Sequence, residues 1–240
     1  MTQIPHPDTS RGARRSGGPH LGVLAIVSLA LTLVGLLLAG LLSGGALLAS
    51  PFVPLDQLLA RYPGNEVAVR VGTLFQFGAS VPLGIFAATL YARQLRLGVR
   101  VPGPSIAYFG GIAASLALGF SALVSWLLSL PDVWTDAALV RALAVLAFLL
   151  GGPAFAVGMG LLIAGAAVPA LILRFTPAWL AWTGLVIAAL AELSFLFLVA
   201  EPFQYLIPIA RFGGGLWLIA IGFLLPTNRA ARNAEVPHDA

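Results

Sequence analysis

Apolar residues run along this chain in long, continuous stretches separated by short polar turns, a pattern typical of membrane-spanning helices. A bilayer core of about 30 Å is crossed by about 20 apolar residues in a helix. The stretches do not alternate apolar and polar residues, which favours helices over the strands of a barrel. Six of them are long enough to cross: residues 21–42, 67–92, 106–130, 153–173, 178–200 and 204–226.

A further apolar stretch, residues 137–150, is harder to place. As a helix it would reach only about 21 Å, which is short of the bilayer core. Gly151, Gly152 and Pro153 follow it and are predicted to break the helix, because glycine frees the backbone and proline lacks an N–H donor. The stretch is therefore either a half-helix or a seventh crossing.

The distribution of arginine decides between these alternatives. Short cytoplasmic loops collect Arg, and a seventh crossing would place Arg174, Arg229 and Arg232 outside. We therefore expect an all-α, polytopic transmembrane helical bundle in the bacterial plasma membrane, with about six spanning helices plus one half-helix on the outer side. Residues 21–226 form this domain. The tails, a disordered stretch over residues 1–20 and a second over residues 227–240, are expected in the cytoplasm.

Composition narrows the chemistry. The chain is 59% hydrophobic and 9% charged, which is more apolar surface than a soluble domain of 240 residues buries. It has no Cys, and all 13 basic residues are Arg, which excludes thiolate chemistry, Cys-bound metals and lysine Schiff bases. We expect no cofactor, no metal site and no catalytic residue. The net charge of +4 is not gathered into a nucleic-acid-binding module, so no nucleic-acid partner is expected.

Two charged residues lie inside the last two apolar stretches. A charge near the centre of a spanning helix costs about 2.5 to 3.5 kcal/mol, so it usually faces the protein interior or water. Glu192 and Arg211 both lie on helix faces rich in small residues, which favours packing against another helix. Counted from the turn between the two helices their depths match, and we expect an ion pair. Arg141 and the carbonyl left free by Pro208 are competing partners.

A second set of polar residues lies at comparable depth. Thr73, Gln76 and Ser80 share one face of the second span, while Ser121 and Ser125 share one face of the third. With the charged pair and the Gly-Gly-Pro break, they can line an outward-facing cavity of the kind that many solute carriers use. The alternative is that each hydroxyl bonds only to its own helix backbone.

Lipids and a second copy of the chain are the partners that the sequence suggests. Arg93, Arg96 and Arg100 share one helix face and can meet anionic inner-leaflet headgroups, at about 1 kcal/mol each, although they also serve topology. Two small-x-x-x-small motifs indicate close helix packing, either within the chain or in a homo-oligomer: Gly40 with Gly44, and Ala113 with Ala117.

The C-terminal third resembles a known family. Residues 177–184 read PAWLAWTG, and residues 215–222 read GLWLIAIG. These segments resemble a bacterial integral membrane family catalogued as domain of unknown function number 4386, over roughly residues 150–226. Ala181 stands where that family usually has Gly. The resemblance implies about six helices and no established activity, so it assigns no site residue.

Two functions fit these observations. The first is a multi-pass protein that binds or transports a small solute through an outward-facing polar cavity, with Glu192 and Arg211 as its charged pair. The second is a non-catalytic accessory, sensor or interaction subunit in which the same pair is structural. Intramembrane hydrolysis ranks third, because the sequence has no HExxH motif and no paired aspartates.

Overall fold

The computed structural model describes residues 18–48 and 50–227, so the predicted tails, residues 1–20 and 227–240, lie almost wholly outside the described residues. The described chain is helical and contains no strand. Its α-helices are α1 (Leu21–Leu42), α2 (Leu55–Leu59), α3 (Glu66–Arg96), α4 (Gly103–Leu127), α5 (Ala137–Leu149), α6 (Phe155–Ile172), α7 (Ala178–Leu193) and α8 (Gly214–Leu224). Two π-helical turns are η3 (Leu150–Ala154) and η6 (Ile209–Gly213). Short 3₁₀ segments are η1 (Ala46–Leu48), η2 (Pro131–Thr135), η4 (Ser194–Leu198) and η5 (Glu201–Leu206).

Six helices in the described residues are long and apolar enough to cross a membrane: Leu21–Leu42, Glu66–Arg96, Gly103–Leu127, Ala137–Ile172, Ala178–Leu198 and Glu201–Leu224. Their outward faces carry large exposed apolar side chains such as Leu37, Leu74 and Phe109. A surface of this kind is suited to lipid rather than water. The chain is thus a multi-pass, all-α membrane protein, as the hydrophobic pattern predicts.

The predicted half-helix is wrong. Residues 137–150 do not end at the Gly-Gly-Pro sequence but continue through η3 into α6, as one helix over Ala137–Ile172. The missing N–H of Pro153 is absorbed by a π-turn, in which the N–H of Phe155 bonds to the carbonyl of Leu150, five residues earlier. The six crossings remain, because the short stretch is the first part of the fourth span.

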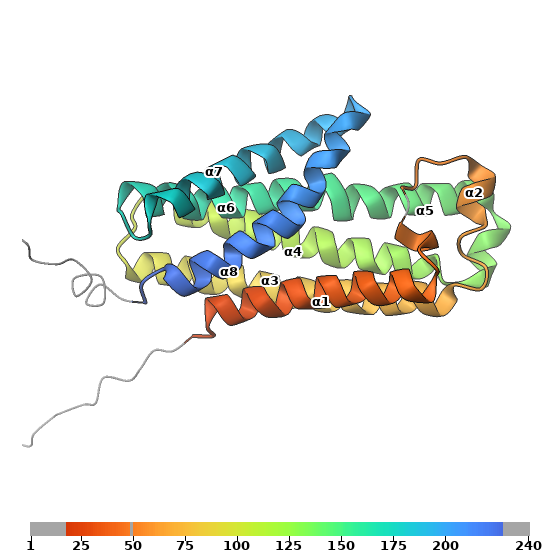
Figure 1. Cartoon of the computed structure of the whole chain (residues 1–240), viewed down its shortest axis with the longest axis horizontal. Helices are drawn as coiled ribbons and strands as arrows, with labels where there is room; N and C mark the ends of the chain where they lie inside the picture. Colours follow the sequence, from red (N-terminus) through yellow and green to blue (C-terminus); the bar gives the residue numbers. More distant parts are fainter. Residues whose placement is uncertain (1–17, 49, 228–240) are drawn as a thin grey trace, which may run out of the picture.

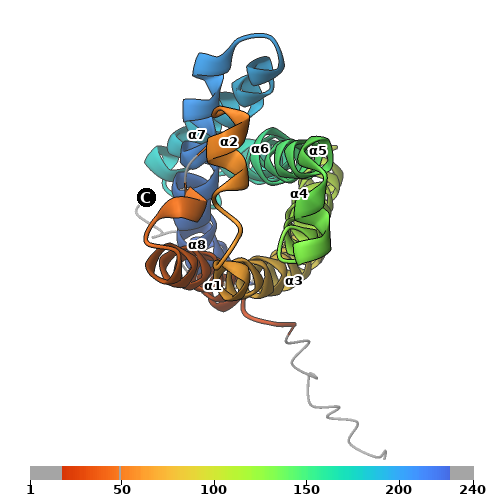
Figure 2. The same ribbon diagram turned by 90° about the vertical axis from the view of Figure 1, so that its right-hand side faces the viewer.

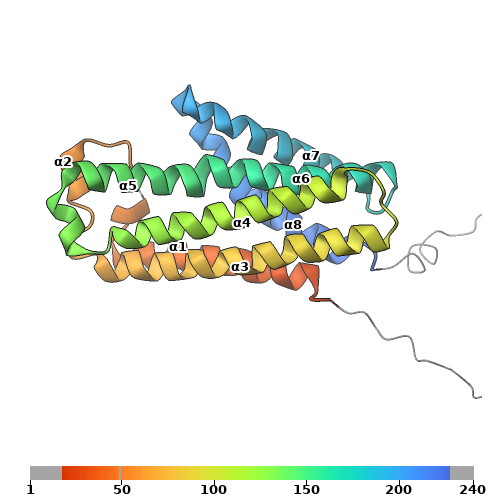
Figure 3. The same ribbon diagram turned by 180° about the vertical axis from the view of Figure 1, so that it is seen from behind.

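The long helices α1, α3, α4 and α5–α6 run side by side, and Figures 1 and 3 show them from opposite sides. The connections from α1 to α3 and from α4 to α5 gather at one end, here called the loop end; α2 lies there (Figure 2). Helix α1 begins and α8 ends at the opposite end, here called the terminal end (Figure 1). The tip of the α7–α8 hairpin stands away from the other helices (Figures 1 and 3).

Helices pack closest in the terminal half of the bundle. A Cβ atom on Gly158 of α6 would lie 2.6 Å from the backbone nitrogen of Ala114 on α4, and one on Gly222 of α8 would lie 2.5 Å from the nitrogen of Gly22 on α1. Only glycine permits such backbone contact. Of the two predicted small-residue motifs, Gly40 with Gly44 does not form a helix contact within the chain at Gly44, which lies beyond α1 with a φ of +58° and nothing within 4 Å of its Cβ position. In the second motif Ala117 is buried, and a role of either motif in a homo-oligomer stays a prediction.

Candidate functional site: a cavity with an arginine at its floor

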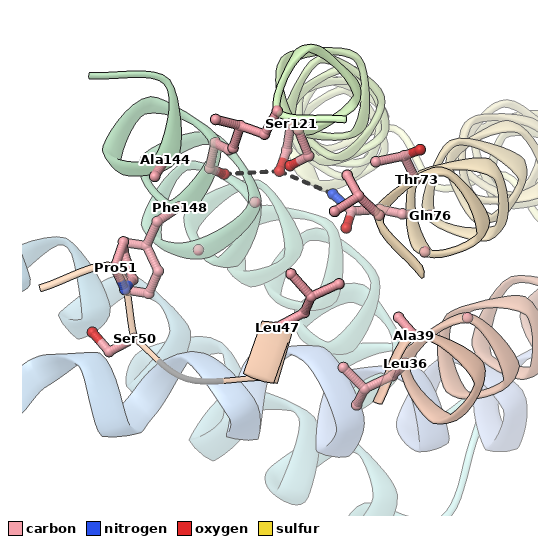
Figure 4. Close-up of a pocket in the computed structure, with 18 of the residues that line it drawn as sticks. Leu36, Ala39, Leu47, Ser50, Pro51, Thr73, Gln76, Ser121, Ala144 and Phe148 are labelled. Atoms are coloured by element: carbon pink, nitrogen blue, oxygen red, sulfur yellow. Dashed lines mark hydrogen bonds between the residues drawn. The ribbon is translucent and has the colours of Figure 1, made fainter. Parts of the chain in front are cut away.

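A cavity of about 570 Å³ lies in the loop-end half of the bundle. This volume is within the range of small-molecule pockets, about 300 to 1,000 Å³. Figure 4 shows side chains from α1, α3, α4 and α5 turned toward it. Five of the predicted site residues line it: Thr73, Gln76, Ser121, Ser125 and Arg211. Helix α1 and the segment after it form a further part of the wall that was not predicted.

A short chain of hydrogen bonds joins three helices at the cavity wall. The amide nitrogen of Gln76 on α3 donates to Ser121 Oγ on α4 over 2.9 Å, and Ser121 Oγ donates to the carbonyl of Ala147 on α5 over 2.8 Å (Figure 4). Thr73 donates to the carbonyl of Arg70 on its own helix. Most lining residues are apolar, so this wall is a small polar patch in a largely apolar cavity.

The guanidinium of Arg211 stands at the floor of the cavity. Its Nη2 donates to the backbone carbonyl of Gly151, and its Cζ lies 5.1 Å from the centre of the Phe155 ring, a cation–π distance. Its Nε is buried without a hydrogen-bond partner. The cation is therefore held by a carbonyl and a ring, and no carboxylate lines the cavity among the described residues.

Two π-turns face each other through this contact. Gly151 belongs to η3, and Arg211 belongs to η6, where the N–H of Gly214 bonds to the carbonyl of Ile209. In an α-helix the N–H of Phe155 would bond to Gly151, but in η3 it bonds one residue earlier, so the Gly151 carbonyl loses its α-helical donor. Arg211 replaces that donor. π-turns inside α-helices are frequent at functional sites.

A second, smaller cavity of about 30 Å³ lies beneath the guanidinium, and Thr32 and Arg211 line both cavities. Beyond the smaller cavity the bundle is filled by buried side chains, among them Leu83, Phe86 and Leu218. The path from the loop end therefore stops near the middle of the bundle, at Arg211.

The predicted Glu192–Arg211 ion pair is wrong: no ion pair joins these groups in the part of the chain that the structure describes. Glu192 Oε1 is buried without a hydrogen-bond partner, and a Cβ on Gly160 would lie 2.6 Å from it. The carboxyl thus meets the α6 helix at Gly160, whereas Arg211 meets η3 at Gly151. These points lie nine residues apart on one continuous helix, or about 13 Å.

Two more predicted site residues lie outside the cavity. Arg141 on α5 donates to the carbonyls of Pro51 (2.9 Å) and Val53 (2.8 Å), so it fixes the segment after α1 rather than pairing with Glu192. Ser80 is buried between α3 and α4, where it donates to the carbonyl of Phe77. For Ser80 the backbone-bonding alternative describes the structure.

Of the three arginines predicted to meet lipid headgroups at the terminal end, one is buried and two are exposed. Arg93 is buried and its Nη1 lies 3.4 Å and 3.3 Å from the carbonyls of Gly222 and Leu225, which form the end of α8. It therefore caps that helix, because unsatisfied carbonyls at a helix C-terminus attract a cation. The prediction that Arg93 contacts lipid headgroups is wrong, since its side chain is buried. Arg96 and Arg100 are exposed.

Several lining residues were not predicted, notably Thr32, Arg61, Tyr62 and Phe148. Arg61 and Tyr62 lie in the connection between α1 and α3, where no helical period marks a face. Burial of Tyr62 raises the pKa of its phenol, with an opposing effect of Arg61. Thr32 lies in a largely apolar span, and its hydroxyl donates to the backbone carbonyl of Ser28, as Thr residues in membrane helices commonly do.

Comparison with known protein families, with curated proteins and with solved structures finds no match for this chain. The resemblance of its C-terminal third to a family of unknown function stays a prediction. The cavity itself therefore supplies the basis for assigning a role.

Proposed function

We propose that this protein binds a small solute in the loop-end cavity, as a membrane carrier does in its outward-facing state, and that it is not an enzyme. The observation that carries the proposal is the guanidinium of Arg211, held at the floor of a cavity of about 570 Å³ between two π-turns. Irregular backbone in a spanning helix is tolerated where it lines a cavity, and carriers bind substrate at such breaks near the bilayer midplane.

The orientation belongs to the same proposal. The loop end faces the outside of a bacterial plasma membrane, and both tails lie in the cytoplasm. Arg96 and Arg100, exposed at the terminal end, then face the anionic inner leaflet. In this proposed orientation the closely packed terminal half closes the cytoplasmic side, and the cavity opens outward.

The alternative of an accessory or sensor subunit loses its main support, because it relied on a structural Glu192–Arg211 pair. Arg211 lines the cavity, its one hydrogen-bond acceptor in the described chain is the Gly151 carbonyl, and its Nε is buried without a partner. Such an arrangement is costly for stability alone and is suited to a ligand.

Cysteine accessibility tests the proposal, because the chain has no native Cys. Ser125→Cys lines the cavity, and Ser80→Cys is a matched control that is buried outside it. In right-side-out vesicles an impermeant methanethiosulfonate reagent should modify Ser125→Cys and leave Ser80→Cys unmodified. Equal protection of both would contradict an outward-open cavity, and modification of Ser125→Cys only in inverted vesicles would contradict the orientation.

A further inference from the structure

We propose that the ligand of this cavity is an amphiphilic monoanion, a molecule with one carboxylate or comparable anionic group joined to an apolar body. This inference rests on the proposed function and names its ligand class. It is carried by three features of the cavity: its charge, the hydrogen-bond donors of Arg211, and the contrast between one small polar patch and an otherwise largely apolar lining.

The charge of the cavity favours an anion. Two lining side chains are cationic, Arg61 in the connection after α2 and Arg211 at the floor, and no acidic side chain lines the cavity among the described residues. A cavity with one sign of charge and low-dielectric walls concentrates ligands of the opposite sign. Organic cations are disfavoured for the same reason.

The donors of Arg211 favour a group with two oxygens. A guanidinium carries five N–H donors in a planar fork. Within the described chain Nη2 donates to the Gly151 carbonyl, and Nε has no acceptor. Fork-like pairing with a carboxylate satisfies two donors at once and provides the negative charge that this side chain lacks.

The walls favour an apolar body attached to that group. Beyond the polar patch of Gln76, Ser121 and Ser125, the lining is mostly aliphatic, aromatic or glycine, and it includes Leu36, Leu47, Phe148, Ile207 and Phe212. A sugar or an amino acid would leave its further polar groups facing these walls without partners, which is costly. An alkyl or aryl acid would place its carboxylate at Arg211 and its chain along these residues.

The test uses protection of the Ser125→Cys protein from N-ethylmaleimide, a neutral reagent, in phosphatidylcholine vesicles at neutral pH. Octanoate should slow modification, whereas octanamide, which has the same chain and no charge, should not. Adding Arg211→Gln should weaken protection by octanoate at least tenfold, since a hydrogen bond to a charged group is worth about 1.5 to 3 kcal/mol. Arg211→Lys should retain part of the protection.

The possible outcomes separate the two proposals. Equal protection by octanoate and octanamide, or protection that survives Arg211→Gln, would overturn the anionic ligand while leaving a ligand cavity in place. Absence of protection by octanoate at a modified cysteine would also overturn it. A cysteine that is never modified would instead remove the cavity itself. The comparison of octanoate with octanamide does not depend on the folding of an Arg211 variant.

The anion can come from solution or from the bilayer, and the same assay distinguishes these sources. If a lipid headgroup enters the cavity, vesicles with phosphatidylglycerol should slow modification of Ser125→Cys without added octanoate, and Arg211→Gln should remove that difference. If the ligand is a free solute, modification should be equally fast in both lipids and octanoate should protect in both. Either result supports an anionic ligand at Arg211.

Discussion

Gly151 allows a sharp test of how the cavity wall is built. A Cβ atom at this position would lie 2.5 Å from Ser121 Oγ and 3.2 Å from Ser121 Cβ. In Gly151→Ala the hydroxyl must therefore leave its place, which breaks the bonds to Gln76 and to the Ala147 carbonyl. Each such bond is worth about 0.5 to 1.5 kcal/mol, so breaking both should cost about 1 to 3 kcal/mol in the free energy of unfolding, before any gain in helix propensity from alanine is counted.

Gly152→Ala is the matched control, since it lies in the same π-turn. Its Cβ would meet the terminal methyl of Ile207 at 3.2 Å, which a small rotation of that side chain relieves. Both substitutions share the gain in helix propensity of about 1 kcal/mol and any general effect on η3. The expected difference of about 1 to 3 kcal/mol between them therefore reports the contact with Ser121.

The measurement is equilibrium unfolding in mixed detergent micelles with sodium dodecyl sulfate, followed by the helical circular dichroism signal. Ser121→Ala removes the hydroxyl, so in that background Gly151→Ala should cost little more than Gly152→Ala. Such non-additivity is expected for two residues in contact. If Gly151→Ala destabilises equally with and without the Ser121 hydroxyl, the proposed wall geometry is wrong.

Three further predictions concern the rest of the bundle. Gly158→Ala should lower the unfolding free energy by about 1 to 3 kcal/mol through overpacking, whereas Gly78→Ala, whose Cβ would meet only a Leu methyl at 3.7 Å, should be neutral or stabilising in the same titration. Arg141→Gln should expose the segment after α1, measured as faster proteolysis there, and unchanged cleavage would count against its two carbonyl contacts. The wild type should lose stability relative to Tyr62→Phe above about pH 10, because burial raises the phenol pKa and the unfolded chain releases its proton first; parallel melting profiles would refute this.

Much of the fold follows from local sequence. Helix α1 spans Leu21–Leu42, the same residues that the apolar run predicts, because a long hydrophobic stretch flanked by turn residues leaves few alternatives. The same holds for the polar faces: spacing of three and four residues on one helix correctly places Thr73 with Gln76 and Ser121 with Ser125, and all four line one cavity. The helical repeat alone determines which residues share one face of a helix, whatever the rest of the molecule does.

The depth of a residue along its span is harder to predict, and counting residues gave the wrong relative depth for Glu192 and Arg211. The expected pairing of Glu192 with Arg211 assumed that both spans descend from one turn as regular helices. In the structure that turn is built from the 3₁₀ segments η4 and η5, and Arg211 lies in a π-turn, so rise per residue is not uniform. Each charged side chain packs against a different part of the α5–α6 helix. This depends on tertiary packing, which the spacing of residues within one segment does not predict.

The two prolines next to the cavity show what the Gly-Gly-Pro signal meant physically. Pro153 lies inside η3 and Pro208 immediately precedes η6, so each π-turn is associated with a residue that cannot donate to the helix. In a membrane the freed backbone groups need partners, and lipid supplies none. A shift to bonds spanning five residues keeps the helix intact while leaving a carbonyl available, and the Gly151 carbonyl is taken by Arg211. Proline with glycine inside a spanning stretch therefore marks the irregular backbone that Arg211 contacts, although the helix there continues.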